Sequence, residues 1–115
     1  RLAVEMSLRT GKGLVTLNTG PLSSDEGNAA EHFVIRRDLI PHVGGDVFDR
    51  DFSHVGVDNL LYARAKKIDQ VARCEEAVMH HFHFSQGAKD DEVYQRGWAN
   101  VEADRALLKR KLAEL

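Results

Sequence analysis

Changes in the spacing of apolar and polar residues mark the elements expected along this chain. Residues 14–17 form a short apolar, partly β-branched run that follows a glycine-bracketed turn, which predicts a buried strand. Residues 32–37 are β-prone and end in charge, so they predict a second extended segment. Residues 38–40 precede Pro41 and predict one short helical turn with Asp38 as its cap.

Helical spacing begins near Gly56 and returns at the end of the chain. The first helical pattern has one apolar face, formed by Val57, Leu60, Leu61, Ala65 and Ile68, and a solvent face, formed by Arg64, Lys66 and Lys67. Residues 70–84 then regain the composition of a strand. Residues 90–115 predict a long amphipathic helix, with acids at its start, bases near its end and an apolar stripe made of Tyr94, Trp98, Val101, Leu108, Leu112 and Leu115. Strands and helices together predict an α/β fold with a mixed sheet.

Two segments between these elements have little apolar patterning. Residues 20–31 are rich in Gly, Ser, Asp, Asn and Ala, and we expect a mobile surface loop there, of the kind that often covers a site. Residues 46–53 place Val47, Phe48 and Phe52 among charged residues and predict an irregular acidic segment.

Length and charge limit the class of protein. A chain of 115 residues predicts a single domain over residues 1–115, and a net charge of −2 gives no broad basic surface for nucleic acid. The single cysteine, Cys74, cannot form an internal disulfide and is expected to be buried or half-buried. The sequence has no apolar run of bilayer length and no secretory signal, so we expect a soluble, cytoplasmic protein without a membrane span. Because the chain opens at Arg1, we expect it to be a fragment of a longer protein.

Residues 49–59 gather three carboxylates and one imidazole where a loop meets the start of a helix. They are Asp49, Asp51, His54 and Asp58. In the first helical turn, the helix dipole would keep Asp58 ionised and able to act as a base. The alternative is that Asp58 is an ordinary helix-start acid.

A histidine cluster follows the strand-like segment. In an extended chain His81 and His83 project from the same face, and paired imidazoles suit a divalent metal. Each could instead be a hydrogen-bonded structural residue.

The order of these segments resembles the acceptor-side, carboxyl-terminal half of GT-A-type glycosyltransferases, particularly compact bacterial and phage members related to family 2. The resemblance covers about residues 18–115. It depends on the order of three runs, at residues 32–38, at residues 44–59, which begin Gly-Gly-Asp-Val-Phe-Asp, and at residues 76–83. A final helix bearing Tyr94, Trp98 and Asp104 completes the pattern.

The resemblance implies that the parent protein transfers a sugar from a nucleotide-sugar donor to an acceptor hydroxyl. Asp58 matches the base, and His81 or His83 matches the contact to a Mn²⁺ or Mg²⁺ ion. The chain differs from the family pattern at two positions. The family has an aromatic residue where this chain has Val57, and a second acid where this chain has Asn59.

The resemblance also implies that the nucleotide-binding half lies upstream, in a missing amino-terminal half of the same protein. Asp49 and Asp51 match the Asp-x-Asp pattern of the metal-binding motif in that half. They lie in the acceptor-side segment together with His54, so we expect them to position Asp58 or the acceptor. Two alternatives stay open. One is a small metal-binding or metallohydrolase-like domain using His54, Asp58, His81 and His83, and the other is a noncatalytic α/β interaction module.

Overall fold

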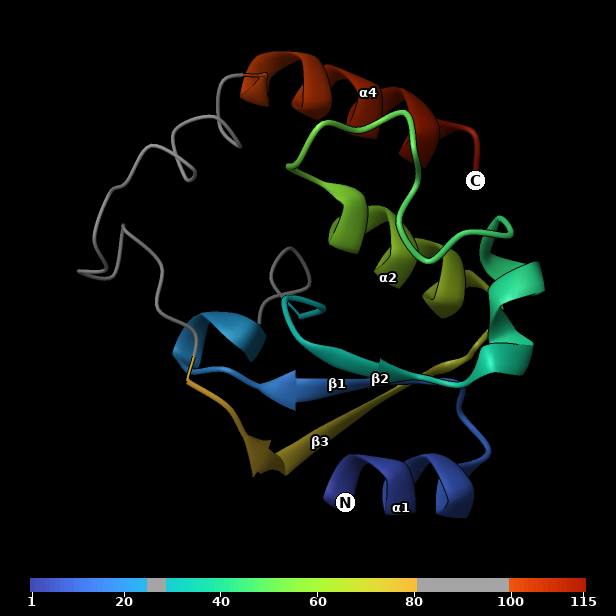
Figure 1. The fold of residues 1–115 in the computed structure, drawn as a ribbon, viewed down its shortest axis with the longest axis vertical. Helices are drawn as coiled ribbons and strands as arrows, with labels where there is room; N and C mark the ends of the chain where they lie inside the picture. The colour runs from blue at the N-terminus through green and yellow to red at the C-terminus, as the bar shows by residue number, and fades with distance from the viewer. Residues whose placement is uncertain (25–28, 81–99) are drawn as a thin grey trace.

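The computed structural model describes residues 1–24, 29–80 and 100–115. Within them, a three-stranded sheet lies between helices (Figure 1). The elements in chain order are α1 (Leu2–Thr10), β1 (Leu14–Asn18), the 3₁₀ helix η1 (Pro21–Ser24), β2 (Phe33–Ile35), the 3₁₀ helix η2 (Arg37–Val43), α2 (Val57–Lys67), β3 (Val71–Val78) and α4 (Val101–Ala113). The predicted α/β class is confirmed.

The sheet is mixed, with β1 at its centre. β2 runs antiparallel to β1, and β3 runs parallel to it on the other side, so the strand order is β2-β1-β3. Leu14 and Val15 of β1 are fully buried although they point to opposite faces. A central strand that is buried on both faces explains the nearly continuous apolar run in the sequence and confirms the predicted strand.

Each face of the sheet has its own core. On the face toward α2, the buried side chains are Leu14, Leu39, Val43, Leu61 and Ala65. On the face toward α1, they are Ala3, Val15, Leu17 and Cys74. Figure 1 shows α1 on one side of the sheet and α2 on the other, with α4 lying outside α2. Cys74 is 2% exposed, which confirms the prediction that it is buried.

The predicted middle helix is confirmed as α2. It begins after Gly56, whose φ of 95° is easily reached only by glycine, and it buries Leu60, Leu61 and Ala65. Ile68 was expected on the buried face but is 43% exposed. The helix ends at Lys67 and the chain turns toward β3 through Asp69 (φ 56°), so Ile68 is no longer held on the helical face.

The prediction that Asp38 caps a short helical turn is wrong. The turn is the longer helix η2, its N-cap is Arg36, and no side chain caps it. Asp38 lies inside the first turn, where its carboxylate accepts a hydrogen bond from Nε of Arg36 at 3.1 Å. The ion pair with this guanidinium therefore takes the place of a bond to the backbone.

The described parts of the segment 20–31, residues 20–24 and 29–31, contain buried side chains where composition predicted a surface loop. Ser23 is 1% exposed, and Ala29 and Ala30 are also buried. The hydroxyl of Ser23 donates to the Gly20 carbonyl at 2.6 Å, which closes the η1 turn. Short side chains predicted a loop here, but the same short side chains allow close packing.

The carboxyl-terminal helix is confirmed over Val101–Ala113, residues 100, 114 and 115 are not helical, and residues 90–99 of its predicted length, including Tyr94 and Trp98, lie outside the described residues. α4 packs against α2, yet its one buried residue is Asp104, while Leu112 is 39% exposed. Its apolar stripe is therefore less buried than the pattern predicted. No described helix has both the length and the apolar character needed to cross a bilayer.

Candidate functional site

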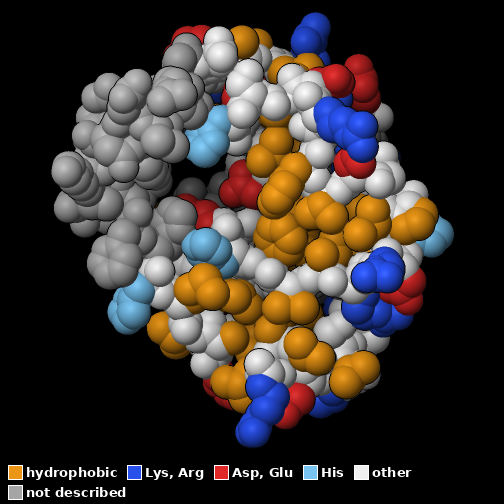
Figure 2. Space-filling model, viewed as in Figure 1, with side chains coloured by type: hydrophobic (Ala, Val, Ile, Leu, Met, Phe, Trp, Pro, Cys, Tyr) orange, Lys and Arg blue, Asp and Glu red, His pale blue; other side chains and the backbone are white. Residues whose placement is uncertain are grey.

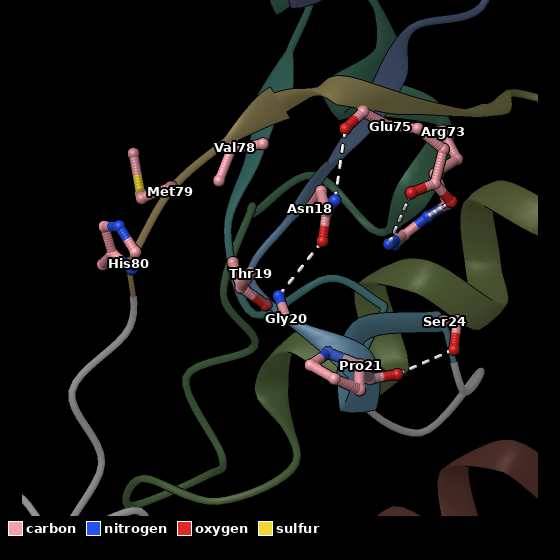
Figure 3. A pocket seen from close by; sticks show the side chains of 10 residues that line it. All are labelled: Asn18, Thr19, Gly20, Pro21, Ser24, Arg73, Glu75, Val78, Met79 and His80. Carbon is pink, nitrogen blue, oxygen red and sulfur yellow. Dashed lines mark hydrogen bonds and ion pairs between the residues drawn. The ribbon is translucent and has the colours of Figure 1, made fainter.

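A pocket opens where the parallel strands β1 and β3 end. Ligand sites in α/β folds are common at this edge, because the carboxyl ends of parallel strands present their loops together. The pocket has a volume of about 500 Å³ and is lined by Asn18, Thr19, Gly20, Pro21, Ser24, Arg73, Glu75, Val78, Met79 and His80. In Figure 3, Asn18, Thr19 and Gly20 lie between Met79 and His80 on one side and Arg73 and Glu75 on the other.

The pocket arises from an irregularity in the pairing of the two strands. Leu17 lies opposite Cys74, but the next residue, Asn18, lies opposite Val78, so the residues between Cys74 and Val78 leave the ladder. The Asn18 side-chain amide donates to the carbonyl of Glu75 at 3.2 Å and so satisfies a backbone group that the ladder leaves unpaired.

Arg73 forms a wall of the pocket and is already occupied by contacts within the chain. Its guanidinium donates to the carbonyl of Ser23 at 2.6 Å and to the hydroxyl of Ser23 at 2.9 Å. It also pairs with the carboxylate of Glu75 at 2.5 Å. Because the positive charge is balanced, hydroxyl, amide and apolar groups determine the character of the pocket.

One hydrogen bond leads from this pocket to Glu31, whose charge acts on Asp58. Thr19 lines the pocket, and its hydroxyl donates to the carboxylate of Glu31 at 3.2 Å. The charge of Glu31 acts on Asp58, and so does the charge of His54. Figure 2 shows acidic side chains inside a hollow on the face drawn, with histidines at its rim. Sequence analysis predicted Asp58 and His54 but missed Thr19 and Glu31.

The carboxyl group of Asp58 binds its proton more tightly than an ordinary aspartic acid. Burial raises its pKa, and the nearby Glu31 carboxylate raises it further. Hydrogen bonds from the backbone N–H of Asn59 and of Asp58 itself, together with the charge of His54, oppose the rise without cancelling it. The shift is opposite to the one expected from the helix dipole alone, because desolvation outweighs the dipole at this position.

The loop that leads into α2 is held by Asp104, which the sequence analysis named in the final helix without giving it a role. Asp104 of α4 accepts hydrogen bonds from the backbone N–H groups of Ser53, His54 and Val55, at 2.9, 2.8 and 2.8 Å. Burial raises the pKa of this carboxyl group, but the three donors and the charge of His54 outweigh burial, so the pKa lies below the ordinary value. The sequence offered no signal, because an acid in a first helical turn is common.

Asp49 and Asp51 pair with the end of α4. Nζ of Lys111 lies 2.6 Å from the Asp49 carboxylate and 2.7 Å from that of Asp51, and Arg64 of α2 lies 3.4 Å from Asp49. Burial raises the pKa of Asp49, but the Lys111 hydrogen bond and the other donors lower it to a value below the ordinary one. Asp49 contacts both helices and Asp51 contacts α4, so the two acids join α2 and α4 to the irregular segment of residues 46–53.

Replacing Lys111 by Met is expected to lower the melting temperature of the protein. Asp49 has a side-chain exposure of only 12%, so removal of the ammonium group leaves its charge with Arg64 at 3.4 Å and the backbone N–H of Asp51 as partners. Lys109→Met is the matched control, because Lys109 lies on the exposed side of the same helix. Equal melting temperatures for the two variants in thermal unfolding would show that the Asp49–Lys111 pair adds no stability.

Acid is expected to weaken the fold through Asp104 and Asp49. Both have pKa values in the folded state below the ordinary value, so their stabilisation is complete above about pH 4 and is lost as the pH falls through the folded values. Asp58 has the opposite sign, since its raised pKa favours the protonated form in the folded state. Urea unfolding at several pH values between about 6 and 3 measures the effect. The free energy of unfolding should fall less steeply with decreasing pH in Asp104→Asn than in the wild type. An equal dependence on pH would contradict the stabilising role of the ionised Asp104.

The predicted metal contacts His81 and His83 lie outside the described residues. Within the described part of the chain, no three His, Cys, Asp or Glu side chains form a group that could hold a metal ion. The structure defines a compact α/β domain with a pocket at the ends of β1 and β3 and a half-buried aspartate at the start of α2. The chain matches no protein-family model, no curated protein and no solved structure.

Proposed function

We propose that this chain is the acceptor-side, carboxyl-terminal part of a GT-A-like glycosyltransferase domain, in which Asp58 accepts the proton of the acceptor hydroxyl. One observation supports the proposal most. Asp58 is half-buried in the first turn of α2 and has a raised pKa, and the Glu31 carboxylate that acts on it accepts a hydrogen bond from Thr19, which lines a pocket of about 500 Å³. Pockets for small ligands commonly measure about 300–1,000 Å³.

The raised pKa suits Asp58 to this role. A carboxylate that binds protons more tightly is a better acceptor for the proton of a hydroxyl group, provided that it is ionised at the working pH. The acceptor oxygen then forms a bond to the anomeric carbon of the donor sugar. The bond between that carbon and the diphosphate oxygen breaks, and the nucleoside diphosphate leaves with the electron pair.

The lining of the pocket suits a sugar or another hydroxyl-bearing ligand. Asn18, Thr19 and Ser24 contribute an amide and two hydroxyl groups; each makes a hydrogen bond within the chain and retains further hydrogen-bonding capacity for ligand hydroxyls. Val78 and Met79 offer apolar surface for the C–H faces of a sugar ring. The pairing of Arg73 with Glu75 avoids a strong preference for a charged ligand.

The proposal includes a Mn²⁺ or Mg²⁺ ion, which would neutralise charge on the departing diphosphate. His81 or His83 is the proposed protein contact, and this assignment depends on the sequence pattern and the resemblance alone. The nucleotide part of the donor is proposed to bind to the half of the domain that precedes this chain.

The test is a donor screen on the full-length protein. Nucleotide sugars are supplied with Mn²⁺ and with mixed hydroxyl acceptors, and release of nucleoside diphosphate is measured with and without acceptor. Acceptor-dependent release from at least one donor supports the proposal. If no donor is consumed and none binds in calorimetry, the proposal is wrong.

A small metal-binding domain is the second candidate, and the closeness of His54 to Asp58 favours it. Both residues belong to the ligand set that the sequence suggested for such a domain. Titration of this chain alone with Zn²⁺ separates the two candidates, because tight one-to-one binding that is lost in His54→Ala supports a zinc site. Weak binding that is equal in both proteins excludes it.

A further inference from the structure

The carboxylate of Asp104 is the most completely enclosed acidic group in the described part of the chain. The residue is 2% exposed, and its oxygens face three successive backbone N–H groups, those of Ser53, His54 and Val55. Consecutive N–H groups that converge on one anion form a backbone nest. Here the anion comes from the chain itself, from a helix about 50 residues further along the sequence.

The nest lies directly before the start of α2. Gly56 follows Val55 with a φ of 95°, and Asp58 follows in the first helical turn. A Cβ atom at Gly56 would lie 3.3 Å from Cδ2 of Leu108 and 3.2 Å from Cε2 of Phe52. α4 therefore holds this point of the chain twice, once through a carboxylate and once through packing.

We infer that Asp104 is a positioning residue, which holds the loop of residues 53–55 so that His54 and Asp58 keep their places beside Glu31. The inference rests on the proposed function, in which Asp58 accepts a proton from the substrate. The geometry supports the inference, because the three hydrogen bonds fix the backbone of residues 53–55. This segment carries His54 and leads into the helical turn that carries Asp58. Small displacements of a catalytic group lower turnover strongly.

The experiment compares Asp104→Asn with Glu102→Gln in the full-length protein. Asn preserves the size of Asp104 but offers one acceptor oxygen where the carboxylate offers two, so at least one N–H of the nest loses its partner. Glu102 lies exposed in the same helical turn, which makes its neutralisation a matched control. Circular dichroism and thermal unfolding record the folded fraction of each variant.

Two measurements on Asp104→Asn are expected to change. Amide hydrogen exchange of residues 53–55 should be at least about tenfold faster, while exchange in β1 stays as in the wild type. The kcat of sugar transfer should fall at least about tenfold while the KM for the donor stays within about twofold, because the donor is bound elsewhere. Glu102→Gln should show neither change.

Other results would overturn the inference. An unchanged kcat per folded molecule in Asp104→Asn would do so, and so would exchange that rises equally throughout α2, α4 and the sheet, which indicates general destabilisation. If the wild-type protein transfers no sugar, the proposed function fails, but the positioning role of Asp104 can still be tested. The test is then the carboxyl-carbon NMR resonance of Asp58, measured at fixed pH. A displacement in Asp104→Asn but not in Glu102→Gln supports positioning, and an unmoved resonance refutes it.

Discussion

Asp58→Asn is expected to lower the kcat of sugar transfer by roughly 10²–10⁴-fold, the usual contribution of a positioned general base. Asn preserves the shape of the side chain but cannot accept the proton of the attacking hydroxyl. The fold should tolerate the change, because burial raises the pKa of Asp58 and so makes its charged form costly at neutral pH. The free energy of unfolding should therefore stay the same or rise while activity is lost, as is common at functional sites.

Steady-state kinetics on the full-length protein, combined with urea unfolding, measure both expectations. The matched control is Asp69→Asn, the same substitution at a carboxylate with 92% side-chain exposure. Asp69 has a φ of 56°, a conformation that Asn also tolerates, so the control adds no strain. Undiminished turnover in Asp58→Asn would remove Asp58 from the mechanism, whereas equal losses in both variants would point to a nonspecific effect of charge.

The ionisation of Asp58 also predicts a pH dependence. A base must be deprotonated to act, so kcat/KM should fall as the pH drops through the raised pKa of Asp58. The acidic limb of the pH–rate profile should therefore lie above the range of an ordinary aspartic acid.

Leu61→Ala is expected to cause the largest loss of stability, roughly 2–5 kcal/mol in the free energy of unfolding. Leu61 is 2% exposed and belongs to the core that joins α2 to Leu14 of β1. Truncation loses the transfer free energy of the buried atoms and leaves a cavity that a close-packed core fills only in part. Because total stability of small domains is about 5–15 kcal/mol, a large fraction of the molecules could unfold at elevated temperature.

Urea denaturation of Leu61→Ala and of Leu8→Ala makes the comparison. Leu8 is 77% exposed on α1, and its substitution should change the free energy of unfolding by no more than about 0.5 kcal/mol. The two variants remove the same atoms from a helix, so the difference between them measures burial. A loss below about 1 kcal/mol for Leu61 would show that the core relaxes around the gap.

The elements β1 and α2 were predictable because their signals lie within a few residues, whereas the helix α1 was not predicted. The apolar run at β1, the 3.6-residue spacing at α2 and the glycine before it all act over short distances, and the structure confirms them. Predictions failed where a neighbouring side chain decided the outcome. Asp38 pairs with Arg36 and so does not cap a turn, and Arg73 of β3 binds Ser23 in a segment that composition alone predicted to be a loose loop.

The candidate site was predictable only at Asp58 and His54. An acid at the start of a helix is visible in the sequence, and so is the imidazole of His54 before it. Glu31 and Thr19 reach the site from the segment around β2 and from the end of β1, and no local pattern relates them to α2. His81 and His83 remain a prediction from the sequence.

By itself, the sequence determined the α/β class, a buried strand at residues 14–17 and the place of Asp58 in a first helical turn, because spacing and polarity along one segment specify how that segment folds. Only the tertiary structure decided which groups surround that carboxylate and what burial does to its pKa. It also assigned Asp104 to the backbone of residues 53–55 and Lys111 to Asp49, pairs separated by about 50 and by 62 positions. Such contacts depend on how helices and strands pack, and packing is a property of the whole chain.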